Sequence, residues 1–142
     1  MGCSAITTAG AEVAALSQAA NKKLALLTPY SEQMTLMEKE YLEMTVPGLK
    51  VVSHRSLGVS SGLAIGDIEP MVAYRESRNI DTDQEDALFL SGTNWRTVDV
   101  ARLIESDLGM PVFSATLVSM WAALGRLGIS GKTGYRSLLN QT

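Results

Sequence analysis

The feature that most constrains this chain is the alternation of short, very apolar runs with longer stretches of helical spacing. The apolar runs are predicted to be strands, at 24–27, 49–54, 87–90 and 111–115. Strands this apolar, separated by helices, are typical of a parallel sheet that is covered on both faces. Right-handed crossovers then favour four strands in the order 2-1-3-4.

The predicted architecture is therefore an α/β fold, a flavodoxin-like four-stranded parallel sheet with helices on both faces. The first helix is expected to start at Thr8, and its apolar face is expected to be Val13, Leu16 and Ala20. The second is expected to open at Ser31 and Glu32. Its spacing predicts a buried stripe of Met34, Met37, Tyr41 and Met44.

Further helices are predicted after the second and third strands. Ser60 to Gly66 is expected to be a loop, and Pro70 to begin a helix that runs to about Asn79. The next is expected over 95–108, ended by Gly109, with Val100, Leu103, Ile104 and Leu108 buried. A last helix is expected over 116–127, and its apolar face is predicted to be Leu117, Met120, Trp121 and Leu124.

Length and composition limit the class of protein. The chain has 142 residues, 46% of them hydrophobic, which predicts one domain over 1–142, with a core at about 5–128 and a tail at 129–142. The net charge of −3 argues against nucleic-acid binding, and no apolar run is long enough to span a membrane. With a single cysteine, Cys3, and no secretory signal, a cytoplasmic location is expected.

Three motif-like stretches carry no convincing site. "GRLGISGKT" has Arg126 where a phosphate-binding loop needs its first glycine, and it follows a helix rather than a strand. "DTDQED" departs from a calcium loop at Asp86 and reads as a solvated acidic turn. His54 is the lone histidine, so neither a catalytic triad nor a metal site can be assembled, and no metal is expected.

Polar residues follow three of the predicted strands, at Thr28-Pro29-Tyr30, 91–94 and 114–116. In an open parallel sheet these ends meet in one crevice. Thr93 and Asn94 are expected to begin a helix whose N–H groups suit a carboxylate, and Tyr30 adds a phenolic donor. The spacing is equally compatible with Ser91 and Asn94 only capping the helix.

The same segments resemble the maleate cis-trans isomerase and arylmalonate decarboxylase group of the Asp/Glu racemase superfamily. The matching stretches are "KLALLTPY", "DALFLSGTNWRT" and "IESDLGMPVFSATLVSMWAALGRLG", with weaker matches at "HRSLGV" and "GYRSLL". The resemblance implies one lobe of a two-lobed fold that closes over a small carboxylate without metal or organic cofactor. In this group a cysteine moves a proton beside the carboxylate or attacks the double bond of maleate.

Carried over by position, Tyr30, Thr93 and Asn94 would bind the carboxylate, while Ser91 and Ser114 would line the pocket. Gly92 stands where the family has its cysteine. The match begins near Ala5, so the first lobe is expected to be absent. Three explanations of Gly92 remain open. The lobe binds a carboxylate without catalysing a reaction, or Gly92 faces a cysteine on another lobe, or glycine simply suits a tight turn.

The resulting hypothesis is a truncated or degenerate lobe of a maleate isomerase or arylmalonate decarboxylase-like protein. Its ancestral chemistry would be isomerisation, racemisation or decarboxylation of small carboxylates. The alternative is a non-catalytic module for carboxylate binding or oligomerisation. A lone lobe is expected to expose the apolar stripe of its last helix and to form a homo-oligomer.

Overall fold

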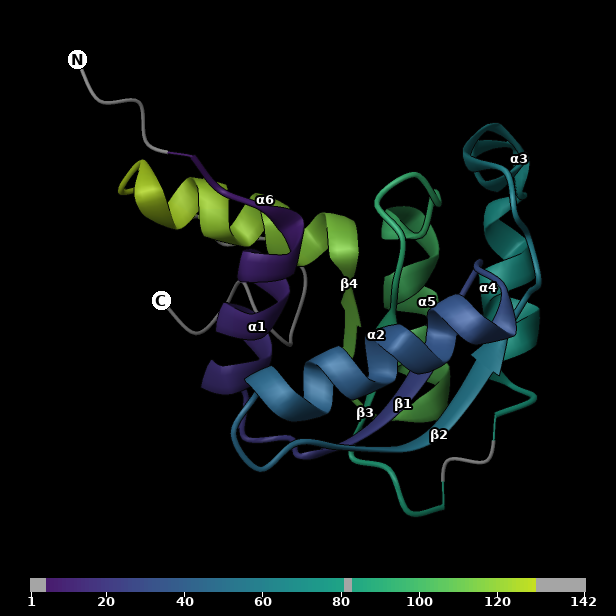
Figure 1. Cartoon of the computed structure of the whole chain (residues 1–142), viewed down its shortest axis with the longest axis horizontal. Helices are drawn as coiled ribbons and strands as arrows, with labels where there is room; N and C mark the ends of the chain where they lie inside the picture. Colours follow the sequence, from purple (N-terminus) through teal and green to yellow (C-terminus); the bar gives the residue numbers. More distant parts are fainter. Residues whose placement is uncertain (1–4, 81–82, 130–142) are drawn as a thin grey trace.

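The sheet is parallel throughout and has the predicted order, β2-β1-β3-β4. The computed structural model describes residues 5–80 and 83–129. Its strands are β1 (Lys23–Thr28), β2 (Lys50–Ser56), β3 (Ala87–Leu90) and β4 (Val112–Ser114). The α/β fold class and strand order are thus confirmed, and Figure 1 shows the sheet with its covering helices.

Six helices connect and cover these strands in the described part of the chain. They are α1 (Thr8–Gln18), α2 (Glu32–Thr45), α3 (Gly62–Asp67), α4 (Pro70–Ser77), α5 (Val98–Leu108) and α6 (Ala115–Arg126). Helices α1 and α2 pack on one face of the sheet, and α4 and α5 pack on the other. Pro70 stands in the first turn of α4 as predicted, and Gly109 ends α5 in a left-handed conformation with φ of 68°.

Two apolar cores lie on opposite faces of the sheet and explain why β1 and β3 are so uniformly apolar. Leu24 and Leu26 of β1 face the core under α1 and α2, whereas Ala25 and Leu27 face the core under α4 and α5. Successive side chains of a strand alternate between its faces, so a strand covered on both sides needs apolar residues at every position. The sequence signal and the packing therefore agree.

The predicted core stripe of α2 is wrong, because that stripe faces outward. Met34, Met37, Tyr41 and Met44 are 51%, 57%, 40% and 79% exposed. The inner face instead carries Thr35 and Leu42, both fully buried. The Thr35 hydroxyl donates to the carbonyl of Ser31 and accepts from Thr28 at 2.6 Å, so a polar contact at the end of β1 sets the rotation of the helix.

Smaller corrections concern the other helices. Residues 62–67, expected as loop, form α3, whose first turn is capped by the Ser61 hydroxyl. In α1 the buried apolar residues are Ala11, Ala15 and Leu16, and the helix ends before Ala20. Leu103 of α5 and Met120 of α6 are each 43% exposed, so only part of their predicted faces is buried.

Asp86 fastens the start of β3 to the start of β1. Its carboxylate accepts the backbone N–H groups of Lys22 at 3.1 Å and Lys23 at 3.0 Å. The Asn21 amide donates to the Asp86 carbonyl at 2.7 Å. The acidic turn, which the sequence predicts to be solvated, therefore ends in a residue with a structural role. Residues 81–82 of this turn lie outside the described part of the chain.

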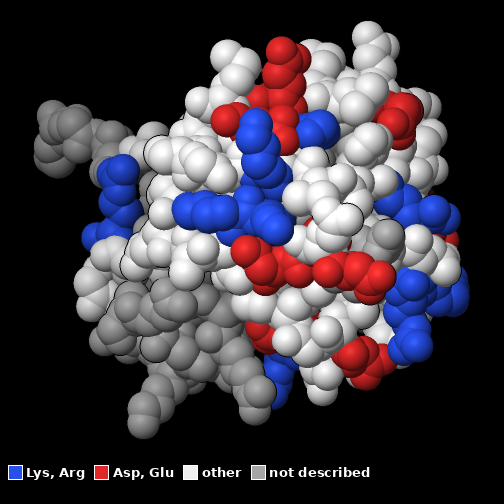
Figure 2. Space-filling model, turned by 90° about the horizontal axis from the view of Figure 1, so that it is seen from below, with Lys and Arg blue, Asp and Glu red and all other residues white. Residues whose placement is uncertain are grey.

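The surface carries both signs of charge. Figure 2, seen from below Figure 1, shows Lys and Arg side chains close to Asp and Glu side chains. Ion pairs such as Arg78–Asp107 at 3.1 Å and Lys39–Glu43 at 2.9 Å add to this mixture. Over residues 5–80 and 83–129, none of the helices combines the length and the apolar character that crossing a membrane requires.

Candidate functional site

The polar residues that follow β1, β3 and β4 lie together at the carboxyl ends of the strands, as predicted. In the parallel register Leu27 is paired with Leu90, and Leu90 with Ser114. The residues that follow each strand therefore lie side by side at the carboxyl ends of the strands, where open α/β sheets bind ligands. The backbone N–H of Ser91 also donates to the carbonyl of Leu27 at 2.9 Å, which extends the pairing past the end of β3.

Gly92 occupies a backbone conformation that side chains of L-residues rarely adopt, with φ of +100°. A Cβ built on Gly92 would stand 3.0 Å from Cγ of Pro29 and 3.4 Å from the Tyr30 hydroxyl. Glycine is thus required by the turn itself as well as by its neighbours. Of the explanations considered for this glycine, the conformational one has direct structural support.

The predicted helix start at Thr93 and Asn94 is wrong, because α5 begins only at Val98. Residues 93–95 form a turn in which the Trp95 N–H donates to the carbonyl of Gly92 at 3.2 Å. The indole of Trp95 is 1% exposed, and seating it in the core delays the helix by three residues. Thr93 and Asn94 therefore do not stand at a helix N-terminus, the feature on which the predicted anion site was based, and carboxylate binding by these residues stays a prediction.

Neighbouring elements hold the 91–97 loop from both sides. The side-chain amide of Asn94 donates to the carbonyl of Gly62 in α3, and the Thr116 hydroxyl of α6 donates to the carbonyl of Thr93 at 3.4 Å. Thr93 and Asn94 are exposed, so both are accessible to a ligand. The Asn94 side chain therefore binds the backbone of α3 and does not cap a helix, which was the alternative interpretation from the sequence.

Ser114 is the last residue of β4 and is fully buried. Its hydroxyl accepts the backbone N–H of Leu117 at 3.3 Å and thereby caps α6. A cap of this kind satisfies an otherwise unpaired helix N–H group. The structure therefore gives Ser114 a role in starting α6, and a pocket-lining role for its side chain stays a prediction.

A cluster of polar side chains extends from the ends of β1 and β3 toward α2. Ser91, 3% exposed, lies near both the Tyr30 hydroxyl and the Glu38 carboxyl of α2 and lowers the pKa of each. Burial and then the Glu38 charge raise the pKa of Tyr30, and these effects exceed that of Ser91. Burial likewise raises the pKa of Glu38, and Ser91 again opposes the shift.

A second carboxyl, Glu12 of α1, lies near these polar side chains and is only 7% exposed. Burial, and secondly the charge of Glu38, raise the pKa of Glu12 from 4.5 to about 7. Glu38 Oε1 is also buried and has no hydrogen-bond partner among the described residues. Glu12 and Glu38 are thus a pair of largely buried acids near Tyr30 and Ser91, and we call them the acid pair.

Sequence reasoning missed both members of the acid pair. A signal existed for each, since Glu12 lies one helical turn before Leu16, and Glu38 lies one turn before Leu42. Placed on those buried faces, each carboxyl had to point toward the sheet. The methionine stripe on the opposite side of α2 concealed this, because it predicted the wrong inner face.

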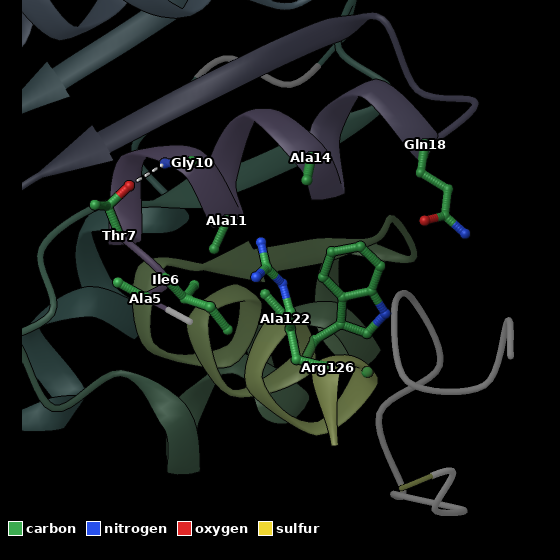
Figure 3. Close-up of a pocket in the computed structure, with 11 residues that line it drawn as sticks. Ala5, Ile6, Thr7, Gly10, Ala11, Ala14, Gln18, Ala122 and Arg126 are labelled. Carbon is green, nitrogen blue, oxygen red and sulfur yellow. Dashed lines mark hydrogen bonds between the residues drawn. The ribbon is translucent and has the colours of Figure 1, made fainter. Parts of the chain in front are cut away.

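The hollow shown in Figure 3 lies elsewhere, between α1 and α6, and measures about 570 Å³. Small and apolar groups from both helices line it, among them Ala11, Ala14, Trp121 and Ala122; Gln18 also lines it, and the Arg126 side chain extends from α6 toward α1. None of the predicted site residues contributes to it. Trp121 is thus only partly buried, against α1, instead of fully inside the core.

His54 makes an exposed pair with Glu32, with 2.7 Å between Nε2 and Oε1. Among residues 5–80 and 83–129 no three His, Cys, Asp or Glu side chains are grouped so as to hold a metal ion. Cys3, residues 130–133 of the "GRLGISGKT" stretch and residues 130–142 of the predicted tail fall outside the described residues.

Comparison with known proteins gives a family match along nearly the whole chain. The model of the family described as arylmalonate decarboxylase matches residues 1–139. Maleate isomerase of Geobacillus stearothermophilus is 29% identical over 125 residues, which are 87% of this chain and 49% of that protein. The chain therefore spans about half the length of the curated relatives it matches.

Solved structures of maleate isomerases also match this chain over about half of their own length. Maleate isomerase Iso from Pseudomonas putida S16, in a mutant with maleate, matches with a TM-score of 0.87 and 26% identity, over 94% of this chain and 53% of that one. A mutant of the Nocardia farcinica maleate cis-trans isomerase, with a covalently bound succinylcysteine intermediate, matches with a TM-score of 0.77 and 26% identity, over 87% and 50%.

Proposed function

The chain belongs to the arylmalonate decarboxylase family, and on that premise we propose that it is a carboxylate-binding lobe of a protein similar to maleate isomerase. The observation that carries this proposal is the convergence of Tyr30, Ser91 and Gly92 at the carboxyl ends of β1 and β3. These residues lie in the segments that match the family's motifs. A small carboxylate or dicarboxylate is the proposed ligand.

Hydroxyl groups would hold the ligand in this lobe. Tyr30 is only partly buried, so its hydroxyl can reach an anion in the crevice. Thr93 and Asn94, both exposed on the neighbouring turn, would add further polar contacts. A hydrogen bond to a charged group contributes about 1.5–3 kcal/mol, so a few such donors support specific but weak binding.

We do not expect efficient turnover from this lobe by itself. The Nocardia farcinica maleate cis-trans isomerase carries a covalently bound succinylcysteine intermediate, and a cysteine thiol is the nucleophile in the chemistry that we propose for a complete protein of this kind. In this chain the family's cysteine position is Gly92, and the single thiol is Cys3, in a different part of the sequence. Isomerisation, racemisation or decarboxylation would then need a thiol supplied by a partner lobe, on whichever chain that lobe is carried.

Titration of isotopically labelled protein with maleate, followed by amide chemical shifts, tests the proposal. Shifts are expected at Tyr30, Ser91 and Thr93. Tyr30→Phe, which removes only the hydroxyl, should weaken binding by about tenfold or more. Tyr41→Phe is the matched control, because Tyr41 lies on the exposed face of α2 and should leave the affinity unchanged. Shifts confined to the α1–α6 hollow would contradict the proposed site.

A second candidate function, an oligomerisation module, is favoured by the exposed face of α2. Met34, Met37 and Met44 form an apolar stripe there, and exposed apolar patches of this kind mark interaction surfaces. The proposed partner is a second copy or the other lobe. Sedimentation equilibrium over a wide range of concentration would distinguish the two candidates, since carboxylate binding requires no self-association.

A further inference from the structure

Strand β2 lies at one edge of the sheet and is long enough to pair with a strand of another molecule. It is first in the order β2-β1-β3-β4, so among the described residues only its β1 side is paired. It has seven residues, whereas β4 at the opposite edge has three. An edge strand presents N–H and C=O groups that can bond a further strand. The outer edge of β2 is therefore where this sheet is most open to extension.

The backbone of Val51 faces this outer edge. The Lys50 N–H donates to the carbonyl of Lys22 at 2.8 Å, so Lys50 faces β1. Backbone groups of successive residues in a strand point to opposite sides, which turns the N–H and C=O of Val51 away from β1. The pairing with β1 then shifts by one residue between Val51 and Ser53, which leaves Val52 without a partner in that strand. An irregularity of this kind bends an edge strand and hinders further pairing.

Two charged side chains of α2 cover the outward groups of Val51. Helix α2 lies against β2 (Figure 1). Glu43 Oε1 accepts the Val51 N–H at 2.9 Å, and Lys39 Nζ donates to the Val51 carbonyl at 2.8 Å. Lys39 Nζ and Glu43 Oε1 also pair with each other at 2.9 Å. Both hydrogen-bonding groups that Val51 turns outward are thus occupied by one ion pair.

The contacts with β2 hold this ion pair in its charged form. Lys39 and Glu43 are one turn apart on α2, and both are partly buried. The hydrogen bonds from Lys39 and from the Val51 N–H lower the pKa of Glu43 below its ordinary value, although burial opposes this. Glu43 is therefore ionised at neutral pH, where it accepts from both donors.

We propose that the Lys39–Glu43 pair blocks the outer edge of β2 and prevents this strand from pairing with the β2 strand of a second copy of the chain. The segment that would pair contains Val51 and Val52, and Val52 is 43% exposed. β-Branched residues of this kind favour strand pairing, so the segment would associate without protection. Self-association is then confined to other surfaces, such as the methionine stripe of α2. The inference is independent of the proposed carboxylate site.

The test frees the edge and leaves the net charge unchanged. Lys39→Ala combined with Glu43→Ala removes both bonds to Val51 together with one charge of each sign. This double variant is expected to associate more strongly than the wild type in sedimentation velocity. Amide hydrogen exchange locates the contact. The Val51 amide of the double variant should exchange faster than in the wild type in dilute solution, and about tenfold more slowly at high protein concentration than in dilute solution.

The matched control is Lys23→Ala combined with Glu40→Ala, which removes the same two charges at exposed positions. The control should associate like the wild type, and in both proteins the exchange of the Val51 amide should not depend on protein concentration. Glu43→Ala alone is a milder change that frees only the Val51 N–H, and it should associate in the same way but more weakly. The single variant decides the question if circular dichroism shows that the double variant does not fold.

Concentration-dependent protection of Val51 that is confined to the variants lacking the ion pair would support the proposal. Variants that associate no more than the control would overturn it. Association without any change in Val51 exchange would also overturn it, because the new contact would then lie away from the β2 edge. So would concentration-dependent protection of Val51 in the wild type, since the edge would then pair with the ion pair in place.

Discussion

Replacing Glu12 by glutamine should change how the stability of the protein depends on pH. Glu12 is 7% exposed and its pKa is raised to about 7, because burial and the charge of Glu38 disfavour its ionised form. In the unfolded chain the same carboxyl titrates near 4.5. Between these values the folded state binds more protons than the unfolded state, so the free energy of unfolding falls as the pH rises.

The expected magnitude follows from the two pKa values. A shift from 4.5 to about 7 corresponds to about 3 kcal/mol, present in full below the unfolded value and lost by about pH 8. Glutamine keeps the shape of the side chain and cannot ionise. Glu12→Gln should therefore gain about 3 kcal/mol relative to the wild type between about pH 4.5 and pH 8.

Urea unfolding at a series of pH values, followed by tryptophan fluorescence, measures this difference. Trp95 is 1% exposed and its environment will change on unfolding. Glu40→Gln serves as control, because Glu40 is exposed and its substitution should leave the wild-type pH dependence unchanged. Parallel curves for Glu12→Gln and the wild type would refute the assignment of Glu12 as a buried acid that resists ionisation.

The remaining predictions concern the crevice and the outer face of α2. Gly92→Ala should lower the free energy of unfolding by about 1–2 kcal/mol or more, measured by urea unfolding, because φ is +100° and Pro29 is close; an unchanged midpoint would contradict this. Asn94→Ala should speed amide hydrogen exchange in α3 by removing the bond to the Gly62 carbonyl, with no such change in α4. Met37→Lys should alter stability by less than about 0.5 kcal/mol, because Met37 is 57% exposed. If the α2 stripe is the self-association surface, the same variant should sediment as a monomer where the wild type does not.

The fold could be predicted because its main signals are local and repeated. Four short apolar runs separated by helices leave few topologies once crossovers are right-handed, and the order β2-β1-β3-β4 follows. The turn residues added precision, since Gly109 and Pro70 stand where their backbone preferences require. These signals do not depend on distant parts of the chain.

The errors arose where a tertiary contact overrides a local pattern. The methionine stripe of α2 has helical spacing, but the Thr28–Thr35 contact and the buried Leu42 turn the other face inward. The helix expected from Trp95 is delayed to Val98 because the indole is buried first. Neither contact can be deduced from spacing alone.

The same limit applies to the candidate site. Tyr30, Ser91 and Gly92 were found from their positions after strands, and the register places those positions side by side. Glu12 and Glu38 come from helices on one face of the sheet, and their approach depends on how α1 and α2 are rotated. A charged residue on a helix is normally read as exposed, so the acid pair emerged only from the packing.

The bond between Asp86 and the two lysine amides has a consequence for how the site is specified. Strand β3 is apolar at all four positions, so sliding it by one residue along β1 would exchange its faces at little hydrophobic cost. The carboxylate of Asp86 accepts two consecutive N–H groups and matches only one alignment. After a one-residue slip the side chain after β3 would point toward α5, and Ser91 would lose its place beside Tyr30 and Glu38. Asp86, at the start of β3, thus determines that the Ser91 hydroxyl, at the other end, faces the proposed site. The alignment of β3 is itself part of the specificity of that site.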